Sequence, residues 1–256
     1  PAADQALAGK EAWAYVPSAV IPKLTQLADN NYSANHRFFV DGTPVVGDVK
    51  NASGWRTILV GGLNAGGKAF YALDITNPLQ PKSLWEFDAS SCGACDVGLS
   101  FGKPVIGKLK NGTWVVLLTS GYNNATGKGL LFVLDAVSGA LIRSIDTGVG
   151  TAANPIGLAQ VSAWVDFPGI NDTIQRAYGG DLFGNIWRFD INDLIAPAGY
   201  EAKLMATAKD ASAVVQPITT APEIGTWNKL PYVFVGTGRL LGDSDLSDTQ
   251  RQSVYA

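Results

Sequence analysis

Few residues in this sequence have the chemistry of a catalytic site, and His36 is the only histidine. Nucleophilic mechanisms of the Ser-His-Asp or Cys-His type use a histidine as general base, so any such mechanism here would have to use His36. His36 lies in the run His36-Arg37-Phe38-Phe39-Val40, where we expect the edge of a strand. A hydrogen-bonded structural histidine explains this position better than a catalytic one.

The two cysteines, Cys92 and Cys95, are separated by Gly93 and Ala94. A thioredoxin-like redox site would place such a pair at a helix start, where the helix N-terminus lowers the thiol pKa. Here the flanking Ser and Asp residues indicate a loop between strands. We predict a small loop disulfide, with two free thiols or a redox or metal role as the alternatives. An oxidised pair would favour an extracytoplasmic location.

A further group of oxygen-bearing side chains lies in the run from Gly242 to Asp248. A solvated acidic turn explains this run better than a metal site does.

The composition argues against several classes of protein. The chain is 46% hydrophobic and 16% charged, which argues against a disordered chain. A pI near 5.1 and the lack of a Lys/Arg run argue against nucleic acid as the main partner. The longest apolar stretches, such as Leu130 to Leu134, are far too short for a transmembrane segment. The chain starts at Pro1 and ends in a strand-like run at Ala256, so we expect it to be a piece of a longer protein.

The strongest pattern in the sequence is a repeat of about fifty residues. Each unit has four short apolar stretches separated by Gly, Asn and Asp turns, which is the composition of one propeller blade. We therefore predict an all-β β-propeller, as a partial or complete ring of four-stranded antiparallel blades. The whole chain, 1–256, is then a fragment of one propeller domain, with blades at about 41–88, 100–148, 157–208 and 214–256.

Conspicuous residues within the units have structural explanations. The third stretch ends in an aspartate at Asp74, Asp135 and Asp190, and we predict that these side chains open turns. Five tryptophans fall on predicted strands, and we expect them in the core between blades: Trp55, Trp85, Trp114, Trp164 and Trp187.

Residues 1–40 are predicted to add a closing strand at Glu11–Val16 and one short N-terminal helix at Ala19–Ala28. Val20, Leu24 and Leu27 would share one face of this helix, with Pro22 in its first turn.

A series of short motifs runs in order through nearly the whole chain, and it includes His36–Gly42, Gly54–Thr57, Ser120–Asn124, Tyr178–Leu182, Gly184–Asp190, Gly236–Arg239 and Gln252–Tyr255. Through these motifs the chain resembles the C-terminal propeller of the PilC/PilY family of type IV pilus tip-associated and pilus-biogenesis proteins. The resemblance implies a non-enzymatic module exported through the periplasm to the pilus tip or outer cell surface. It further implies support of pilus assembly and twitching motility, with pilins or minor pilins and a host or abiotic surface as partners.

Some members of that family bind calcium in a loop just before the strand that matches Ala177–Asp181. The equivalent loop here is Asp166 to Gln175, and its candidate ligands are Asp166, Asn171, Asp172, Thr173 and Gln175. Calcium takes six to eight oxygen ligands, and this loop has only two carboxylates, with Gln175 where an acidic residue is expected. A Gly/Pro turn and a weak calcium site that modulates the pilus both stay open.

Two other functional classes also stay open. The stretches Phe70–Asp74 and Val133–Gly139 resemble docking repeats of quinone (PQQ)-dependent dehydrogenases, although no adjacent cysteine pair and no clear Glu/Asn/Asp calcium triad is present. An assembly scaffold like the outer-membrane propellers is the third class. Since propeller loops are the usual binding sites, we predict that partners contact the loops Gly61–Lys68, Ser90–Gly98 and Tyr122–Lys128.

Overall fold

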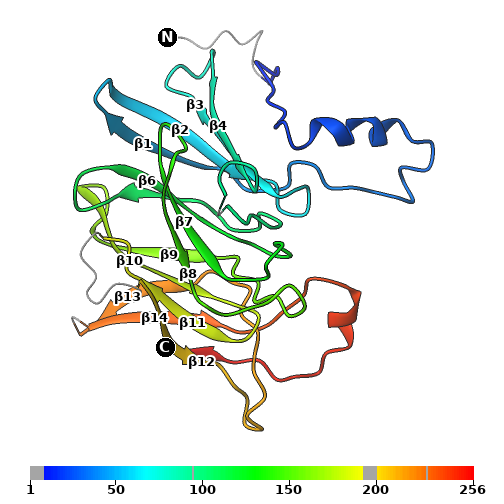
Figure 1. Ribbon diagram of the computed structural model, residues 1–256, viewed down its shortest axis with the longest axis vertical. Coiled ribbons are helices and arrows are strands. Elements are labelled where there is room, and N and C mark those ends of the chain that lie inside the picture. The colour runs from blue at the N-terminus through cyan, green and yellow to red at the C-terminus, as the bar shows by residue number, and fades with distance from the viewer. Residues whose placement is uncertain (1–8, 94, 193–200, 229) are drawn as a thin grey trace.

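The structure is a computed structural model that describes residues 9–93, 95–192, 201–228 and 230–256, and its regular structure is mostly β (Figure 1). Short 3-10 helices occur at η2 (Ile21–Ala28) and η3 (Asp243–Ser247). The strands are β1 (Val45–Asn51), β2 (Gly54–Gly62), β3 (Ala69–Asp74), β4 (Lys82–Asp88), β5 (Val105–Lys108), β6 (Trp114–Thr119), β7 (Leu130–Asp135), β8 (Leu141–Asp146), β9 (Val161–Phe167), β10 (Asn171–Gly180), β11 (Asn185–Phe189), β12 (Ala202–Thr207), β13 (Glu223–Trp227), β14 (Leu230–Gly236) and β15 (Val254–Tyr255).

The strands pair in chain order as antiparallel units, which are β1–β4, β5–β8, β9–β12 and β13–β15. A parallel pairing of Thr173 with Lys108 joins the second unit to the third. Figure 1 shows the units following one another down the molecule, from β1–β4 at the top to β13–β15 near the bottom. Each four-stranded unit is one propeller blade.

The core lies between successive blades, and strand β6 shows how it is built. Val116 and Leu118 belong to the core shared with β1–β4, whereas Val115 and Leu117 belong to the core shared with β9–β12. Successive side chains of a strand point to opposite faces of its sheet. A strand covered on both faces is therefore continuously apolar, as in Trp114-Val115-Val116-Leu117-Leu118.

Glycines at equivalent places in the first strands let neighbouring blades approach closely. A Cβ on Gly107 in β5 would lie only 2.5 Å from Cδ1 of Ile174 in β10. A Cβ on Gly47 in β1 would lie 3.2 Å from Cδ1 of Ile106 in β5. Because these approaches join adjacent blades, the glycines are explained by packing rather than by chemistry.

The predicted role of the blade aspartates is confirmed at two of the three positions. Asp74 accepts a hydrogen bond from the Thr76 N–H at 3.0 Å, and Asp135 accepts one from the Ser138 N–H at 2.8 Å. Asp190 instead forms ion pairs with Arg176 and Arg188.

The predicted burial of the tryptophans holds for only part of the set. Trp85 and Trp187 are buried in the core, and Trp114 and Trp164 are half-buried. The prediction is wrong for Trp55, whose side chain is 59% exposed. Trp55 follows directly on the β1–β2 turn, at the tip of the hairpin, where the Trp114 ring of the next blade covers only part of its indole.

The predicted closing strand at Glu11–Val16 is also wrong, because this segment pairs with no described strand. Side chains attach it instead. Glu86 accepts hydrogen bonds from the Tyr15 hydroxyl at 2.7 Å and from the Ser18 N–H at 2.8 Å.

The predicted short helix is present as η2, with Pro22 in its first turn. Leu24 and Leu27 are exposed, and Val20 alone of the predicted apolar face is buried.

The last sheet differs from the predicted fourth blade. The run from Ile218 to Ala221 is not a strand, and Ile218 forms only an isolated bridge to Gly238. Pro217 and Pro222 bracket this run, and proline has no N–H to donate to a ladder. Strand β13 begins at Glu223, and within the described residues the sheet has three strands.

We expect Phe132→Ala to destabilise the protein by about 3–5 kcal/mol, because the ring is fully buried between blades. Its centroid lies 5.3 Å from that of Phe87 in the preceding blade. The measurement is the free energy of unfolding in urea. The matched control is Phe167→Ala, at a 62% exposed ring, where we expect a change within about 0.5 kcal/mol. Equal stability of the two variants would contradict this account of the core.

Candidate functional site

The three loops predicted to contact partners gather at one end of the first two blades. Strands β2 and β4 run in the same direction, so the loops that follow them leave the first blade at the same end, and an antiparallel bridge of Leu99 with Tyr122 brings the loop after β6 beside them. The Lys68 ammonium donates a hydrogen bond to the Asn123 carbonyl, and the Gly98 N–H donates to the Ser120 carbonyl at 2.7 Å. We call the described residues of these loops, 61–68, 90–93, 95–98 and 122–128, the loop face.

Asp96 holds two of these loops together. Its carboxylate accepts hydrogen bonds from the Ala125 N–H at 2.7 Å, the Thr126 N–H at 2.9 Å and the Asn124 side-chain amide at 2.8 Å, and also from the Thr126 hydroxyl. Burial pushes the pKa of Asp96 upward, but the hydrogen bonds from Thr126, Ala125 and Asn124 together outweigh burial and hold that pKa below its ordinary value. The loop 122–128 is thus fixed by a charged acceptor.

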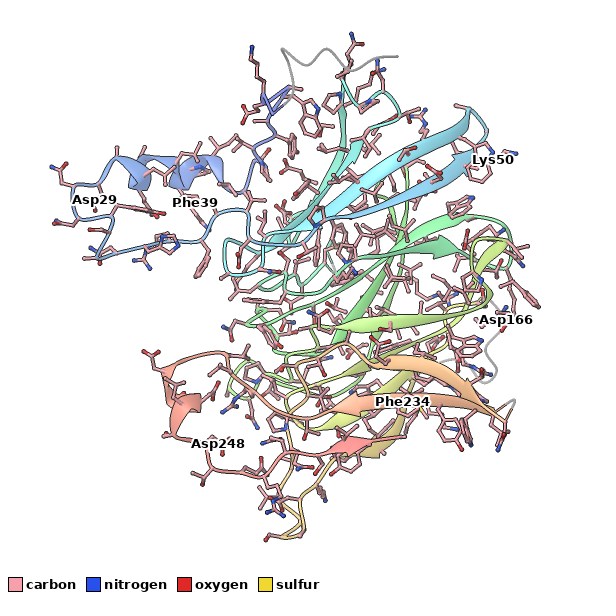
Figure 2. The ribbon with its side chains drawn as sticks, turned by 180° about the vertical axis from the view of Figure 1, so that it is seen from behind. Asp29, Phe39, Lys50, Asp166, Phe234 and Asp248 are labelled. Atoms are coloured by element: carbon pink, nitrogen blue, oxygen red, sulfur yellow. A yellow bond between two sulfur atoms is a disulfide. The ribbon has the colours of Figure 1, made fainter. Side chains whose placement is uncertain are left out.

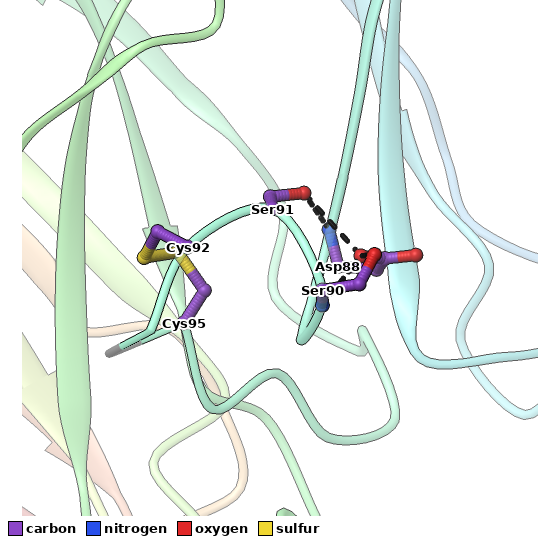
Figure 3. Close-up of a disulfide and its surroundings, with 5 residues drawn as sticks. All are labelled: Asp88, Ser90, Ser91, Cys92 and Cys95. Carbon is purple, nitrogen blue, oxygen red and sulfur yellow. Dashed lines mark hydrogen bonds between the residues drawn. A yellow bond between two sulfur atoms is a disulfide. The ribbon is translucent and has the colours of Figure 1, made fainter.

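A disulfide between Cys92 and Cys95 closes the middle loop. Cys95 is buried against the core between the first two blades, so the bridge attaches the loop to the sheets. Just before it, the Asp88 carboxylate accepts hydrogen bonds from the Ser90 N–H at 2.8 Å and the Ser90 hydroxyl at 2.6 Å (Figure 3). These bonds hold the turn from Asp88 to Ser90, which leads into the disulfide.

The N-terminal segment contacts the loop that follows β2. The Lys23 ammonium of η2 donates to the Gly66 carbonyl at 2.8 Å. A Cβ on Gly66 would lie 1.8 Å from the Phe39 carbonyl oxygen, so only glycine fits there. Figure 2 shows the tip of this segment, at Asp29, projecting away from the sheets. This edge of the loop face is therefore covered by the chain itself.

The five candidate calcium ligands lie on the β9–β10 hairpin, where the structure gives a tight turn and strand rather than a loop. Asp166 accepts a hydrogen bond from the Trp164 indole at 2.7 Å, and Asp172 accepts one from the Gly169 N–H at 2.9 Å. Asn171 and Thr173 bond to each other through their side chains at 2.7 Å.

This hairpin does not present a ready calcium cage. The side chains of Asn171 and Thr173 bond to each other, whereas Asp172 accepts from the Gly169 N–H in the turn. Within the part of the chain that the structure describes, no three His, Cys, Asp or Glu side chains gather as a metal-binding group. Calcium needs six to eight oxygens, and the residues present do not supply them as one shell. Calcium binding by this hairpin stays a prediction.

The other two sequence candidates have internal partners. In the loop Gly242–Asp248, Asp245 accepts hydrogen bonds from Arg239 and the Leu241 N–H, both at 2.8 Å. His36 is exposed and lies outside any strand, so its predicted position at a strand edge is wrong. Its ring instead contacts Phe38 edge-on, with the ring centroids 5.1 Å apart.

A second surface, not predicted from the sequence, lies at the hairpin end of the molecule. The exposed ring of Trp55 meets that of Trp114 across the first two blades, beside Lys50 and Lys108. The sequence does hold a signal for it, because Lys50 and Asn51 precede Trp55, and Lys108 and Asn111 precede Trp114, at two equivalent hairpins. Figure 2 shows Lys50 and Asp166 on the side of the molecule opposite Asp29.

No helix among the described residues combines the length and the apolar character needed to cross a bilayer.

The lowered pKa of Asp96 predicts a specific dependence of stability on pH. Because the folded pKa lies below the unfolded value, the carboxylate stabilises the fold above its ordinary pKa, about 3.9, and this contribution is lost as the pH falls through the folded pKa. We expect Asp96→Asn to lower the free energy of unfolding at pH 7, and this deficit should shrink as the pH approaches the folded pKa. Urea unfolding across this pH range measures it. Asp243→Asn, at an exposed aspartate in η3, is the control and should show no such trend, whereas a deficit independent of pH would contradict the assignment.

Comparison with known proteins agrees with the geometry of the blades. A family model described as the PilY1 beta-propeller domain matches residues 7–256. The chain is similar to the type IV pilus biogenesis factor PilY1 of Pseudomonas aeruginosa strain PAO1, at 36% identity over 96% of this chain and 23% of that protein. A PilY1 homolog of Xylella fastidiosa is 35% identical over 96% of this chain and 19% of that protein.

A solved structure gives the same result. The crystal structure of the Pseudomonas aeruginosa PilY1 C-terminal domain aligns with a TM-score of 0.78 at 32% identity, covering 96% of this chain and 53% of that one. The chain thus spans about a fifth of the length of the curated relatives. The predicted propeller fold and the family resemblance are both confirmed, and the chain belongs to the PilY1 β-propeller domain family.

Proposed function

We propose that this propeller is a non-enzymatic module of type IV pilus biogenesis that works at the pilus on the outer cell surface. The relatives that it resembles over 95% or more of its length are named type IV pilus biogenesis factors, and this observation carries the proposal. In this role the module supports pilus assembly and twitching motility, and it helps the pilus attach to host or abiotic surfaces.

The loop face is the surface that we assign to pilins or minor pilins. Binding surfaces work best when their loops are held in place before the partner arrives, because less conformational entropy is then lost on binding. The Asp96 hydrogen bonds and the Cys92–Cys95 disulfide supply that rigidity. The disulfide also suits an oxidising compartment, which supports an extracytoplasmic location.

We expect deletion of residues 41–256 from the protein in its own bacterium to remove surface pili and twitching motility. The measurements are the amount of pilin sheared from the cell surface and the width of the twitching zone. Normal pili and motility in this strain, with the truncated protein present at the usual level, would overturn the proposal.

A single substitution tests the loop face. Ala125 is exposed in loop 122–128, and its N–H rather than its side chain bonds to Asp96. We expect Ala125→Arg to reduce twitching and surface pilin several-fold, because the arginine projects into the partner's position. Leu79→Arg adds the same side chain at a 75% exposed site at the other end of the blades, and it should leave both readouts unchanged. Melting temperatures of both purified variants check that the fold is intact, and normal piliation in Ala125→Arg would exclude this face.

Calcium modulation is the finer part of the proposal. Because the β9–β10 hairpin gathers no complete set of oxygens, we expect weak binding, with a Kd of about 10⁻⁴–10⁻³ M, the range of extracellular modules. Calcium should raise the melting temperature of the wild type, and Asp172→Asn should weaken this effect while its amide oxygen still accepts from Gly169. Asp243→Asn is the control. If calorimetric titration shows no heat and the melting temperature does not rise, the chain does not use calcium.

An oxidoreductase assay distinguishes the enzymatic alternative. The chain is mixed with the quinone cofactor, calcium, an alcohol and an electron acceptor. We expect no turnover above that of a heat-denatured sample. Saturable turnover would favour a quinone-dependent dehydrogenase over the pilus module.

A further inference from the structure

We propose that the groove between Trp55 and Trp114 binds an acidic saccharide, a sugar chain that carries uronic acid carboxylates. The groove lies between the β1–β2 and β5–β6 hairpins, at the end of the blades opposite the loop face. It has a volume of about 620 Å³, within the range of small-molecule sites. Its lining residues include Lys50, Asn51, Trp55, Lys108, Asn111, Thr113, Trp114 and Asp135.

The floor of the groove is aromatic. The ring centroids of Trp55 and Trp114 lie 5.8 Å apart, and the ring planes meet at 67°. The indole of Trp55 is 59% exposed to solvent, even though burial of an indole would contribute strongly to the stability of the fold. Because the two indoles are set at an angle, a ligand can stack on the flat apolar face of one and contact the edge of the other. The C–H face of a pyranose ring is also apolar and can pack against such an indole face.

The walls of the groove carry positive charge. The ammonium of Lys50 lies 5.7 Å from the centroid of the Trp55 ring, and that of Lys108 lies 5.7 Å from the centroid of the Trp114 ring. Neither lysine forms an ion pair with any residue that the structure describes. Asp135 is the one carboxylate on the lining, and it caps its own turn through Val137 and Ser138. The lining therefore has two cations to one anion, in a chain whose net charge is −3.

The neutral polar groups of the groove are also hydrogen-bond donors. The side-chain oxygen of Asn51 accepts from the Ser53 N–H at 2.9 Å, and that of Asn111 accepts from the Thr113 N–H at 2.9 Å. Their amide NH₂ groups have no partner among the described residues, so they are free to donate to a ligand. A ligand that matches two ammonium groups and two amide donors must be rich in acceptors. Carboxylates and ring hydroxyls on an apolar sugar ring meet that demand, whereas a peptide carboxylate alone would leave the indoles uncovered.

The arrangement is repeated rather than incidental. Lys50 and Trp55 are cross-strand partners in the β1–β2 ladder, and Lys108 and Trp114 are cross-strand partners in the β5–β6 ladder. The third blade has the related pair Arg176 and Trp164, but there both side chains are already used. Arg176 pairs with Asp190, and the Trp164 indole donates to Asp166. Only the first two pairs keep their donors for a ligand.

This inference gives the proposed surface attachment a ligand class, and it rests on that proposal for its biological setting. The test is a binding measurement on the purified chain, so its failure is separate from a failure of the piliation assays. The probe is a galacturonic acid trisaccharide, with the neutral galactose trisaccharide as its matched control. Binding is followed by tryptophan fluorescence and by calorimetry.

We expect saturable binding of the galacturonate, weakened about tenfold by Trp55→Ala and severalfold by Lys50→Gln combined with Lys108→Gln. The neutral trisaccharide should bind about tenfold more weakly, and added salt should reduce the difference. Trp227→Ala removes a 67% exposed tryptophan outside the groove and should leave binding unchanged. The substituted side chains lie on the surface, and an unchanged melting temperature checks the fold of each variant.

Four results would overturn the proposal. The first is no binding at millimolar galacturonate, and the second is binding that Trp55→Ala leaves intact. Equal binding of the neutral and acidic sugars would refute the role of the lysines. A glutamate peptide that binds where galacturonate does not would replace the saccharide with an acidic protein segment.

Discussion

The packing of each blade against both of its neighbours is the constraint on which this structure depends. In β6, Val116 and Leu118 face one neighbouring blade and Val115 and Leu117 face the other, and all four are buried. Each such side chain contributes about 1.5–3 kcal/mol through burial. If one neighbouring blade is missing, the two side chains that face it lose most of that gain. A blade of this kind has no stable existence alone, so stability and order extend along the row of blades together.

Function is confined by the same constraint to the ends of the strands. Both faces of a middle blade are used for packing, so only the turns and loops are free to contact other molecules. The loop end and the hairpin end of the blades differ in whether their polar and aromatic side chains already have partners. At the loop face, Asp96 accepts hydrogen bonds from backbone and side-chain donors of the neighbouring loop, and the Cys92–Cys95 bridge constrains its own loop. At the hairpin end, Trp55 and Lys50 are left in contact with water.

What the sequence could predict depends on this difference between strands covered on both faces and exposed strand ends. Strands β3, β6 and β7 were predictable, because a strand covered on both faces is almost continuously apolar and stands out from its turns. The N-terminal segment was not, because Tyr15 and Ser18 reach Glu86 through side-chain contacts that leave no periodic pattern. Trp55 was misassigned to the core because an aromatic residue on a strand is usually covered. Its exposure depends on how much of the ring the next blade covers at the hairpin tip, which only the packing of the two blades determines.

Two separate surfaces on one rigid row of blades have an energetic consequence. Groups that share no partner and lie well apart contribute independently to stability and binding. Asp96 and its partners belong to loops that follow β4 and β6, whereas Lys50 and Trp55 belong to the turn between β1 and β2, and among the described residues no hydrogen bond or ion pair joins the two sets. The blades between them transmit position without transmitting conformational change, because a close-packed core deforms little. A molecule held at one end is therefore presented at a fixed distance and orientation from whatever is bound at the other, as the proposed role at the pilus requires.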